Sequence, residues 1–437
     1  MLKAFQEHTD NNLPFLKKSK ILIALSGGLD SVVLTHMCHE LSFNVSLAHC
    51  NFNLRGNESD EDENFVVELA NSLDLEVFVQ HFGTESYAKK QKLSIQMAAR
   101  KLRYEWFKEL TNQFQFDYIL TAHHADDNLE TFLINLTRGS GLDGLKGIPV
   151  VNNNIIRPLL KFSREDIESY ANKYNLKWRE DSSNASTKYL RNKLRHEVIP
   201  TLKEVNPQLL HSFESTIKNL NDTSDIVEQS LKTVLESVIQ NVNNNEVLYS
   251  VPEFLKLNNP KAYIYEIFKE YGFTAFEDIY NLLEAQSGKQ IYSKTHRLIK
   301  NRDSLILTVL DNNDGEDIQI VKDDKTIGIP NGVLYFDKVK VVSKPQKFEI
   351  FVDAETLSYP LQVRSWKDGD FFYPIGLQGK KKLSKYFKDE KLSLLDKEKC
   401  QLLCSNNEVV WVINYRADNR FKVTKETKNI LKITLQQ

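Results

Sequence analysis

The sequence of 437 residues has few cysteines, no long apolar segment and no excess of charge of either sign. Its four cysteines are too few and too scattered for a disulfide framework, which favours a reducing, cytoplasmic setting. No apolar run approaches the roughly 18 residues of a membrane span, and residues 1–20 lack the apolar core of a secretion signal. The net charge of −2 excludes a uniformly basic nucleic-acid-binding protein, so any such surface must be a local patch.

The first half of the chain alternates between strand-like and helix-like patterns. We expect strands at about Ile21–Leu25, Phe43–Ala48, Glu76–Phe82 and Tyr118–Thr121, and helices at about Ser31–Leu41, Asp60–Leu73, Ile95–Phe107 and Asp126–Leu136. This alternation predicts a parallel sheet with helices on both faces. Ligands of such sheets bind at the carboxyl ends of the strands, where Ser26, His49 and His123 lie.

The pattern changes after Pro207. Residues 209–239 and 261–285 have helical periodicity, whereas the tail from about Gly328 contains short strand-like runs. We therefore expect an α/β domain over 1–205, a mainly helical domain over 206–318, and a small, β-rich α+β domain over 319–437.

The segment Ser26-Gly27-Gly28-Leu29-Asp30-Ser31 lies between a predicted strand and a predicted helix. Glycines allow close approach of the backbone, and free N–H groups at a helix N-terminus attract phosphate. A carboxylate would repel bare phosphate, so Asp30 is better suited to a site beside Mg²⁺. No Gly-Lys-Ser/Thr follows, which excludes the Walker pattern. The alternative is a simple Gly-Gly turn in which Asp30 caps the next helix.

The pattern Ser-Gly-Gly-x-Asp-Ser resembles the signature of the PP-loop, or N-type, ATP pyrophosphatases. These enzymes adenylate a substrate oxygen and then let a nucleophile displace AMP. Further segments resemble, in order, those of one group of these enzymes, the bacterial tRNA(Ile)-lysidine synthetases. They are Ala99-Arg100-x-x-Arg103-Tyr104, Thr121-Ala122-His123-His124-Ala125-Asp126-Asp127, Arg138-Gly139, Arg157-Pro158-Leu159-Leu160, Asp181-Ser182-Ser183-Asn184, Arg191-Asn192-x-x-Arg195 and the tail from Trp411 to Thr427.

This resemblance implies a Rossmann-like PP-loop ATPase domain and a specific reaction. ATP with Mg²⁺ would adenylate the wobble cytidine of the isoleucine tRNA with a CAU anticodon, releasing pyrophosphate. Free L-lysine would then displace AMP from C2, giving lysidine and changing the tRNA from methionine to isoleucine specificity. The resemblance places ATP on Ser26, Gly27, Gly28, Leu29, Asp30 and Ser31.

His123 and Asp127 are four residues apart, so they would share one face of a helix. A histidine beside a carboxylate near a phosphate loop can position a metal or a substrate. The alternative is a helix cap at Asp126 beside a solvated histidine. The resemblance favours catalytic roles for Asp30, His123, Asp127 and Arg195, with Asp30 and Asp127 as Mg²⁺ ligands. It gives no such support to His124.

Paired arginines at Arg100 and Arg103, and at Arg191 and Arg195, could present guanidinium groups to phosphate. Solvated faces with ion pairs are the alternative. Residues 157–204 contain eleven basic and seven acidic side chains, and residues 379–399 contain eight and four. The second stretch also contains Tyr386 and Phe387, which could stack on bases. We expect RNA contacts from Arg100, Arg103, Arg138, Arg191, Lys380, Lys381 and Lys382.

Two features limit the resemblance. Asn51 and Phe52 stand where many relatives carry Asp and His, so we assign these two residues no catalytic role. The alternative functions are another PP-loop enzyme, such as a tRNA thiolase or an amide-forming ligase, and a non-catalytic RNA-binding module. The absence of a Cys-x-x-Cys pair argues against thiolation. A homodimer is left open, because the oligomeric state cannot be read from the sequence.

Overall fold

The computed structural model describes residues 1–436 except 181–189, 244, 311–316 and 344–347. The chain divides into two compact units, Met1–Glu228 and Gln229–Gln437, which are described separately. Within the described residues, no helix combines the length and apolar character needed to cross a membrane.

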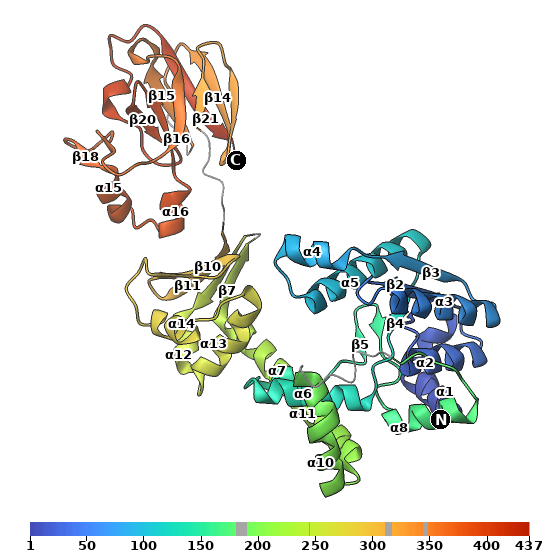
Figure 1. Cartoon of the computed structure of the whole chain (residues 1–437). Helices are drawn as coiled ribbons and strands as arrows, with labels where there is room; N and C mark the ends of the chain where they lie inside the picture. Colours follow the sequence, from blue (N-terminus) through green and yellow to red (C-terminus); the bar gives the residue numbers. More distant parts are fainter. Residues whose placement is uncertain (181–189, 244, 311–316, 344–347, 437) are drawn as a thin grey trace. The chain divides into compact units, whose positions relative to one another are not determined.

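Unit 1 contains a six-stranded sheet in the order β3-β2-β1-β4-β6-β5 (Figure 1). The strands are β1 (Ile21–Ala24), β2 (Val45–Asn51), β3 (Val77–His81), β4 (Tyr118–Leu120), β5 (Val151–Asn152) and β6 (Ile155–Ile156). All neighbouring pairs are parallel except β5 and β6. The parallel α/β prediction is therefore confirmed, including each of the four predicted strands.

The helices of unit 1 cover both faces of this sheet. They are α1 (Leu2–Asn12), η1 (Pro14–Lys18), α2 (Leu29–Glu40), α3 (Asn57–Ser72), α4 (Thr84–Gln91), α5 (Ile95–Phe114), α6 (Ala125–Thr137), α7 (Leu142–Leu145), α8 (Arg164–Lys173), α9 (Leu190–Lys193), η3 (Leu194–Val198), α10 (Ile199–Val205) and α11 (Leu209–Val238), the last of which runs into unit 2.

Alternating side chains of each strand pack against helices on opposite faces of the sheet, because successive strand residues point to opposite faces. Ile21 and Ile23 belong to the core that contains α2 and α8, whereas Leu22 packs with Trp106 and Phe107 of α5. The helix that follows the glycine loop, α2, therefore lies on one face of the sheet, and α5 lies on the other.

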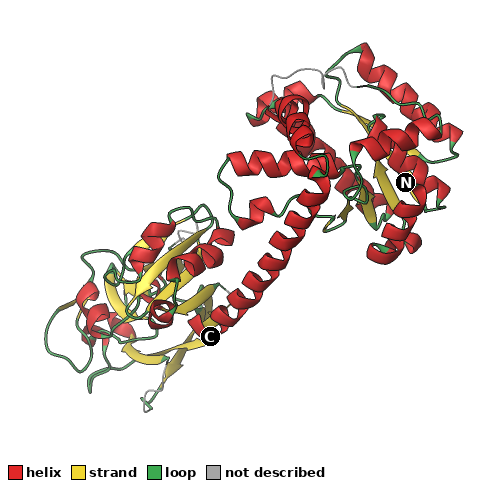
Figure 2. Cartoon of the chain, turned by 90° about the horizontal axis from the view of Figure 1, so that it is seen from below, coloured by secondary structure: helices red, strands yellow, loops and turns green. Residues whose placement is uncertain are grey.

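Unit 2 is richer in strands (Figure 2). Its first part is a five-stranded antiparallel sheet in the order β7-β8-β11-β10-β9, covered by short helices. The elements are β7 (Ile239–Asn243), β8 (Glu246–Ser250), α12 (Val251–Lys256), α13 (Pro260–Phe268), η4 (Lys269–Tyr271), α14 (Phe276–Leu282), β9 (Gln290–Tyr292), β10 (His296–Asn301) and β11 (Ser304–Val309). Helices α11, α13 and α14 confirm the helical predictions, but these five strands were not predicted.

The last part of the chain contains two four-stranded sheets, β12-β16-β19-β20 and β13-β14-β21-β15, packed on one apolar core, and a small β17–β18 hairpin. The elements are β12 (Ile318–Ile320), β13 (Thr326–Ile329), β14 (Gly332–Val339), β15 (Glu349–Asp353), η5 (Ala354–Thr356), β16 (Leu361–Ser365), β17 (Phe371–Phe372), β18 (Lys381–Lys382), α15 (Leu383–Asp389), α16 (Leu394–Glu398), β19 (Gln401–Ser405), β20 (Glu408–Val412), η6 (Asn419–Phe421) and β21 (Ile430–Gln436). This confirms a β-rich C-terminal domain with a few helices.

Candidate active site

The glycine loop connects β1 to α2, as its sequence predicts. Gly27 has a φ of +85°, a conformation that side chains other than hydrogen rarely allow. The Ser31 hydroxyl closes the loop, because it accepts the N–H of Ser26 at 3.2 Å and donates to the carbonyl of Gly28 at 2.9 Å. Gly28 is the N-cap of α2, so the unpaired N–H groups of the first helical turn face the end of the loop. This geometry suits an anion.

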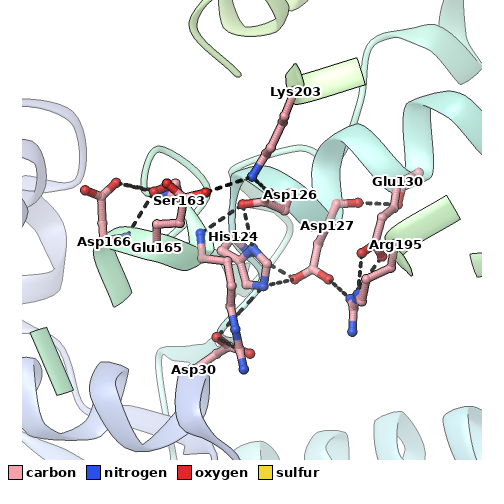
Figure 3. Close-up of polar contacts among 12 residues, drawn as sticks. Asp30, His124, Asp126, Asp127, Glu130, Ser163, Glu165, Asp166, Arg195 and Lys203 are labelled. Atoms are coloured by element: carbon pink, nitrogen blue, oxygen red, sulfur yellow. Dashed lines mark hydrogen bonds and ion pairs between the residues drawn. The ribbon is translucent and has the colours of Figure 1, made fainter. Parts of the chain in front are cut away.

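Asp30 lies in the first turn of α2 and points toward residues from two other elements (Figure 3). Its carboxylate forms an ion pair with Arg164, the first residue of α8. The same Oδ1 atom lies 3.8 Å from Nε2 of His124. Asp30 is therefore not a simple helix cap, since its side chain connects the glycine loop to the end of β4.

The N-terminus of α6 carries the second group of polar side chains. His124 is its N-cap and is only 3% exposed. Nε2 of the ring lies 3.4 Å from Asp127 and Nδ1 lies 3.7 Å from Asp126. The Asp127 carboxylate also accepts the backbone N–H of His124 at 3.1 Å. The imidazole thus lies among three carboxylates, one from the glycine loop and two from α6.

This placement differs from the helical argument made for His123. Helix α6 begins at Ala125, so His123 precedes it and does not share a helical face with Asp127. His123 instead bonds through Nδ1 to the hydroxyl of Thr121 at 3.0 Å. The histidine that contacts both Asp30 and Asp127 is His124, to which the sequence pattern gave no role.

Three further charged residues tie α6 to α9 and to the η3 turn that follows it. Nε of Arg195 donates to Glu130 at 2.5 Å, and a terminal nitrogen donates to Asp127 at 3.0 Å. Nε of Arg191 lies 3.0 Å from Glu130, which is only 1% exposed. Glu130 therefore holds both members of the arginine pair predicted from the sequence, although Glu130 itself was not predicted as a site residue.

Charge stabilisation sets the ionisation of this cluster. Burial disfavours the charged imidazole, but the carboxylates of Asp126, Asp127 and Asp30 outweigh it and raise the pKa of His124. Burial likewise opposes ionisation of Asp127, yet the two histidines, the N–H of His124 and Arg195 keep its pKa below the usual value. The contacts in this cluster thus favour the charged forms of both His124 and Asp127, whereas burial raises the pKa of Glu130.

A separate set of basic side chains lies on the α5 side of β4 and β6. Arg100 lies over the ring of Tyr104 at 4.9 Å, and Arg103 lies over the ring of Phe52 at 5.3 Å. Arg157, which follows β6, is 5% exposed and donates to the carbonyl of Pro149 at 2.7 Å. Arg157 and Tyr104 were not predicted as site residues from the sequence.

Two residues where the chain departs from the family pattern have structural contacts. The amide of Asn51 donates to Glu63 at 2.8 Å and to Asp60 at 3.2 Å, which ties β2 to α3. Phe52 stacks on Phe82 with ring centroids 5.5 Å apart. Both contacts agree with assigning neither residue a role in catalysis.

The remaining predicted RNA contacts belong to other elements of the chain. Arg138 is exposed at the C-cap of α6. In unit 2, Lys380 lies over the Phe371 ring at 3.4 Å, Lys381 pairs with Asp389 at 2.8 Å, and Lys382 is exposed. The predicted stacking by Tyr386 and Phe387 is wrong, because both rings are buried in the core beneath α15. The segment 181–184 lies outside the described residues.

Comparisons with known proteins agree with this organisation. A PP-loop domain model matches residues 1–202, a TilS substrate binding domain model matches 242–310, and a TilS substrate C-terminal domain model matches 361–434. The tRNA(Ile)-lysidine synthase of Parabacteroides distasonis is 40% identical over 417 residues, or 94% of each chain. The chain belongs to the tRNA(Ile)-lysidine synthase family. It is therefore an ATP-dependent ligase built on a PP-loop domain.

Further similarities extend to one more relative and to solved structures. The tRNA(Ile)-lysidine synthase of Bacteroides thetaiotaomicron is 36% identical over 95% of each chain. Among solved structures, a TilS C-terminal domain is 19% identical, with a TM-score of 0.25, and covers 28% of this chain and 99% of that one. The U34-tRNA thiolase NcsA of Methanococcus maripaludis is 18% identical, with a TM-score of 0.40, and covers 50% of this chain and 80% of that one.

Proposed function

We propose that the protein ligates L-lysine to C2 of the wobble cytidine of the isoleucine tRNA with a CAU anticodon, in the cytoplasm. The cytosine O2 attacks the α-phosphate of ATP and pyrophosphate leaves, which gives an adenylated base. The ε-amine of lysine then attacks C2, AMP departs with the oxygen, and the amine loses its proton. The product is lysidine, which changes the tRNA from methionine to isoleucine specificity.

The observation that carries this proposal is that His124 contacts both the glycine loop and helix α6. Asp30 from the glycine loop and Asp127 from α6 lie 3.8 and 3.4 Å from the same ring nitrogen. An adenylating loop and a group suited to bind an amine are thus adjacent, as a two-step reaction at one base requires.

ATP would lie on Ser26, Gly27, Gly28, Leu29, Asp30 and Ser31 with Mg²⁺ on its phosphates. Mg²⁺ is usually held by one or two carboxylates together with phosphates and water, so Asp30 and Asp127 suffice as protein ligands. The metal would neutralise charge on the leaving pyrophosphate.

Asp127 would hold the lysine amine for the second step. A free lysine amine has a pKa of about 10.4, so it must lose a proton before it can attack. The low pKa of Asp127 favours binding of the ammonium form. When Arg195 turns from Asp127 to phosphate, one of the groups that lowers this pKa is removed, and Asp127 becomes a better proton acceptor. Arg195 then stabilises phosphate charge.

RNA would be bound by basic residues of both units. In unit 1 we assign this role to Arg100, Arg103, Arg138 and Arg191. In unit 2 we assign it to Lys380, Lys381 and Lys382. Sulfur transfer by cysteine needs a reactive thiolate. Burial raises the pKa of each of the four free thiols, that of Cys50 to about 12, so sulfur transfer is disfavoured.

Pyrophosphate release from ATP tests the proposal directly. The tRNA and the amino acid are varied independently. We expect pyrophosphate to be released only in the presence of the isoleucine tRNA. We expect AMP to be formed only when lysine is present as well. Release without tRNA, or equal activity with any amino acid, would contradict the proposed reaction.

The variant Asp30→Asn tests the role of the glycine loop. It keeps the size of the side chain but removes the charge suited to Mg²⁺. We expect pyrophosphate release to fall at least about a hundredfold, in line with the loss of a key charge-stabilising group, while tRNA affinity stays unchanged. Loss of tRNA affinity would instead show that Asp30 has a structural role.

A further inference from the structure

The two consecutive histidines lie on different sides of the strand ends. His124 contacts Asp30 of α2, which packs on one face of the sheet. His123 interacts electrostatically with Arg157 after β6 and with Arg100 of α5, the helix on the other face. His123 also interacts with Asp127 and Arg191, so the end of β4 lies between the cluster around Asp127 and a second polar environment that contains Arg157 and Arg100.

This second environment has an excess of positive charge. Arg100 and Arg157 interact with each other through their like charges. Within the described part of the chain, neither guanidinium forms an ion pair with a carboxylate, whereas Arg191 pairs with Glu130. Burial, together with these arginines, lowers the pKa of His123 to about 4 against the opposing charge of Asp127. His123 is thus neutral near pH 7 and does not add to the repulsion.

Arg157 is the residue that most needs a charged partner. It is only 5% exposed, and its neutral partners are the carbonyl of Pro149, which accepts from Nη1, and the hydroxyl of Tyr104. Its Nε atom is buried and has no hydrogen-bond partner among the residues that the structure describes. Buried guanidinium groups are costly unless they are paired, so Arg157 and the neighbouring Arg100 together lack a counter-charge that an anionic ligand would supply.

The position of Arg157 argues against the phosphates of ATP as that ligand. In the sheet order β1-β4-β6, Arg157 follows a strand two positions from the one that leads into the glycine loop. Two strand spacings correspond to about 10 Å. The aromatic partners of Arg100 and Arg103, namely Tyr104 and Phe52, are also on the α5 side. Stacked guanidinium groups beside aromatic rings are typical of RNA recognition.

We propose that Arg157 and Arg100, with Tyr104 and His123 beside them, bind a phosphodiester group of the RNA strand that carries the target nucleotide. This inference rests on the proposed function. The target base then enters from the α5 side and meets ATP at the end of β4, between His123 and His124. Arg157 binds the phosphate as a buried fork, and Arg100 closes over it from α5.

The variant Arg100→Gln tests this site, because Arg100 is exposed and its loss should not affect folding. The matched control is Lys101→Gln, which removes one charge from the same helix at a lysine paired with Glu105. Affinity for the isoleucine tRNA is measured without ATP over a range of salt concentrations, and the KM for ATP is measured from pyrophosphate release. We expect R100Q to weaken RNA affinity about tenfold, with no change in KM for ATP. The salt slope, which is the slope of log affinity against log salt concentration, should fall in magnitude by roughly 0.7–0.9.

A second variant, Arg157→Lys, keeps the buried charge but removes Nε and the fork. We expect it to weaken RNA affinity at an unchanged KM for ATP. Tyr104→Phe, which removes the hydroxyl next to Arg157 and keeps the ring, provides the same readout should R157K fail to fold. An R100Q slope equal to that of K101Q overturns the site, and so does a raised KM for ATP at unchanged RNA affinity. Absence of tRNA binding by the unmodified protein would instead contradict the proposed function itself.

Discussion

At the scale of single residues, Glu130 shows how a buried carboxylate organises charged partners. It accepts bonds from Arg195 at 2.5 and 3.0 Å and lies 3.0 Å from Arg191. Because these arginines come from a segment that follows α8, one carboxylate on α6 holds a distant part of the chain against the catalytic cluster. These bonds place Arg191 and Arg195 beside the residues proposed for catalysis.

The variant Glu130→Gln should destabilise unit 1 while keeping the shape of the side chain. It removes the carboxylate that pairs with Arg191 and leaves Arg195 with Asp127 alone, and we expect the free energy of unfolding to fall by about 2 kcal/mol. Denaturant titration measures this change. The control Glu105→Gln removes an exposed carboxylate 3.8 Å from Lys101, where we expect a change within about 0.5 kcal/mol. Equal effects of the two substitutions would contradict the role assigned to Glu130.

The same residues show what the sequence could and could not predict. The glycine loop with Asp30 and the pairing of Arg191 with Arg195 were predicted from local patterns of the chain. The catalytic roles of Asp127 and Arg195 came from the resemblance to the family. His124 was given no role because its contact with Asp30, about ninety positions away in the sequence, cannot be read from the local pattern. Contacts of that kind depend on how β1 and β4 pair, and a single sequence does not contain that pairing.

At the scale of elements, a similar distinction applies to strands and helices. Buried parallel strands such as β1 and β2 are apolar runs followed by loops, so they were predicted within two or three residues. The hairpin of β10 and β11 was missed, although its turn at Arg302 has a positive φ and is flanked by apolar runs. Here the helical pattern of 261–285 dominated the interpretation of the whole segment. Tyr386 and Phe387 were misjudged because their burial depends on β17, β19 and β20 packing against α15.

The ion pair between Arg364 of β16 and Asp370 before β17 makes a prediction about pH. The two side chains are 7% and 16% exposed and form two bonds of 2.8 Å. Burial opposes ionisation of Asp370, but Arg364 and the N–H of Lys367 lower its pKa. Because the folded pKa lies below the unfolded value of about 3.9, the stabilisation is present above that pH and is lost as pH falls through the folded pKa.

The variant Asp370→Asn tests this sign. We expect it to be less stable than the unmodified protein at pH 7, by about 1–3 kcal/mol, because Arg364 loses its charged partner. The difference in thermal midpoint should shrink below about pH 4, as Asp370 of the unmodified protein becomes protonated. Asp368→Asn changes an exposed neighbour and should show no such convergence. A constant difference from pH 7 to pH 3 would contradict the lowered pKa.

At the scale of the whole molecule, the chemistry and the basic C-terminal surface belong to different units. Unit 1 contains the PP-loop and every residue of the catalytic cluster, whereas residues 379–399 with their eight lysines belong to unit 2. Under the proposed function, a division of this kind would separate recognition of the nucleotide from binding of the rest of the RNA. It follows that substitutions in unit 2 should change affinity and salt dependence without changing the chemical step.

The lysines of the β17–β18 region provide that test. Lys381 pairs with Asp389, so Lys380 and Lys382 supply most of the net charge available to phosphate. The double variant Lys380→Gln/Lys382→Gln should weaken tRNA affinity. It should also reduce the salt slope by roughly 0.7–0.9 for each phosphate that is no longer neutralised, because counterion release scales with the number of neutralised phosphates. The rate of pyrophosphate release at saturating tRNA should not change.

The matched control for these lysines is the double variant Lys322→Gln/Lys325→Gln. It removes the same charge from two exposed positions of the C-terminal domain and should leave the salt slope as it is. Equal slopes for the two double variants would place the RNA on another surface of unit 2. A lower rate at saturation would show that this unit also takes part in the chemical step, because a residue that contributes only to binding affects affinity and not the rate of the bound complex.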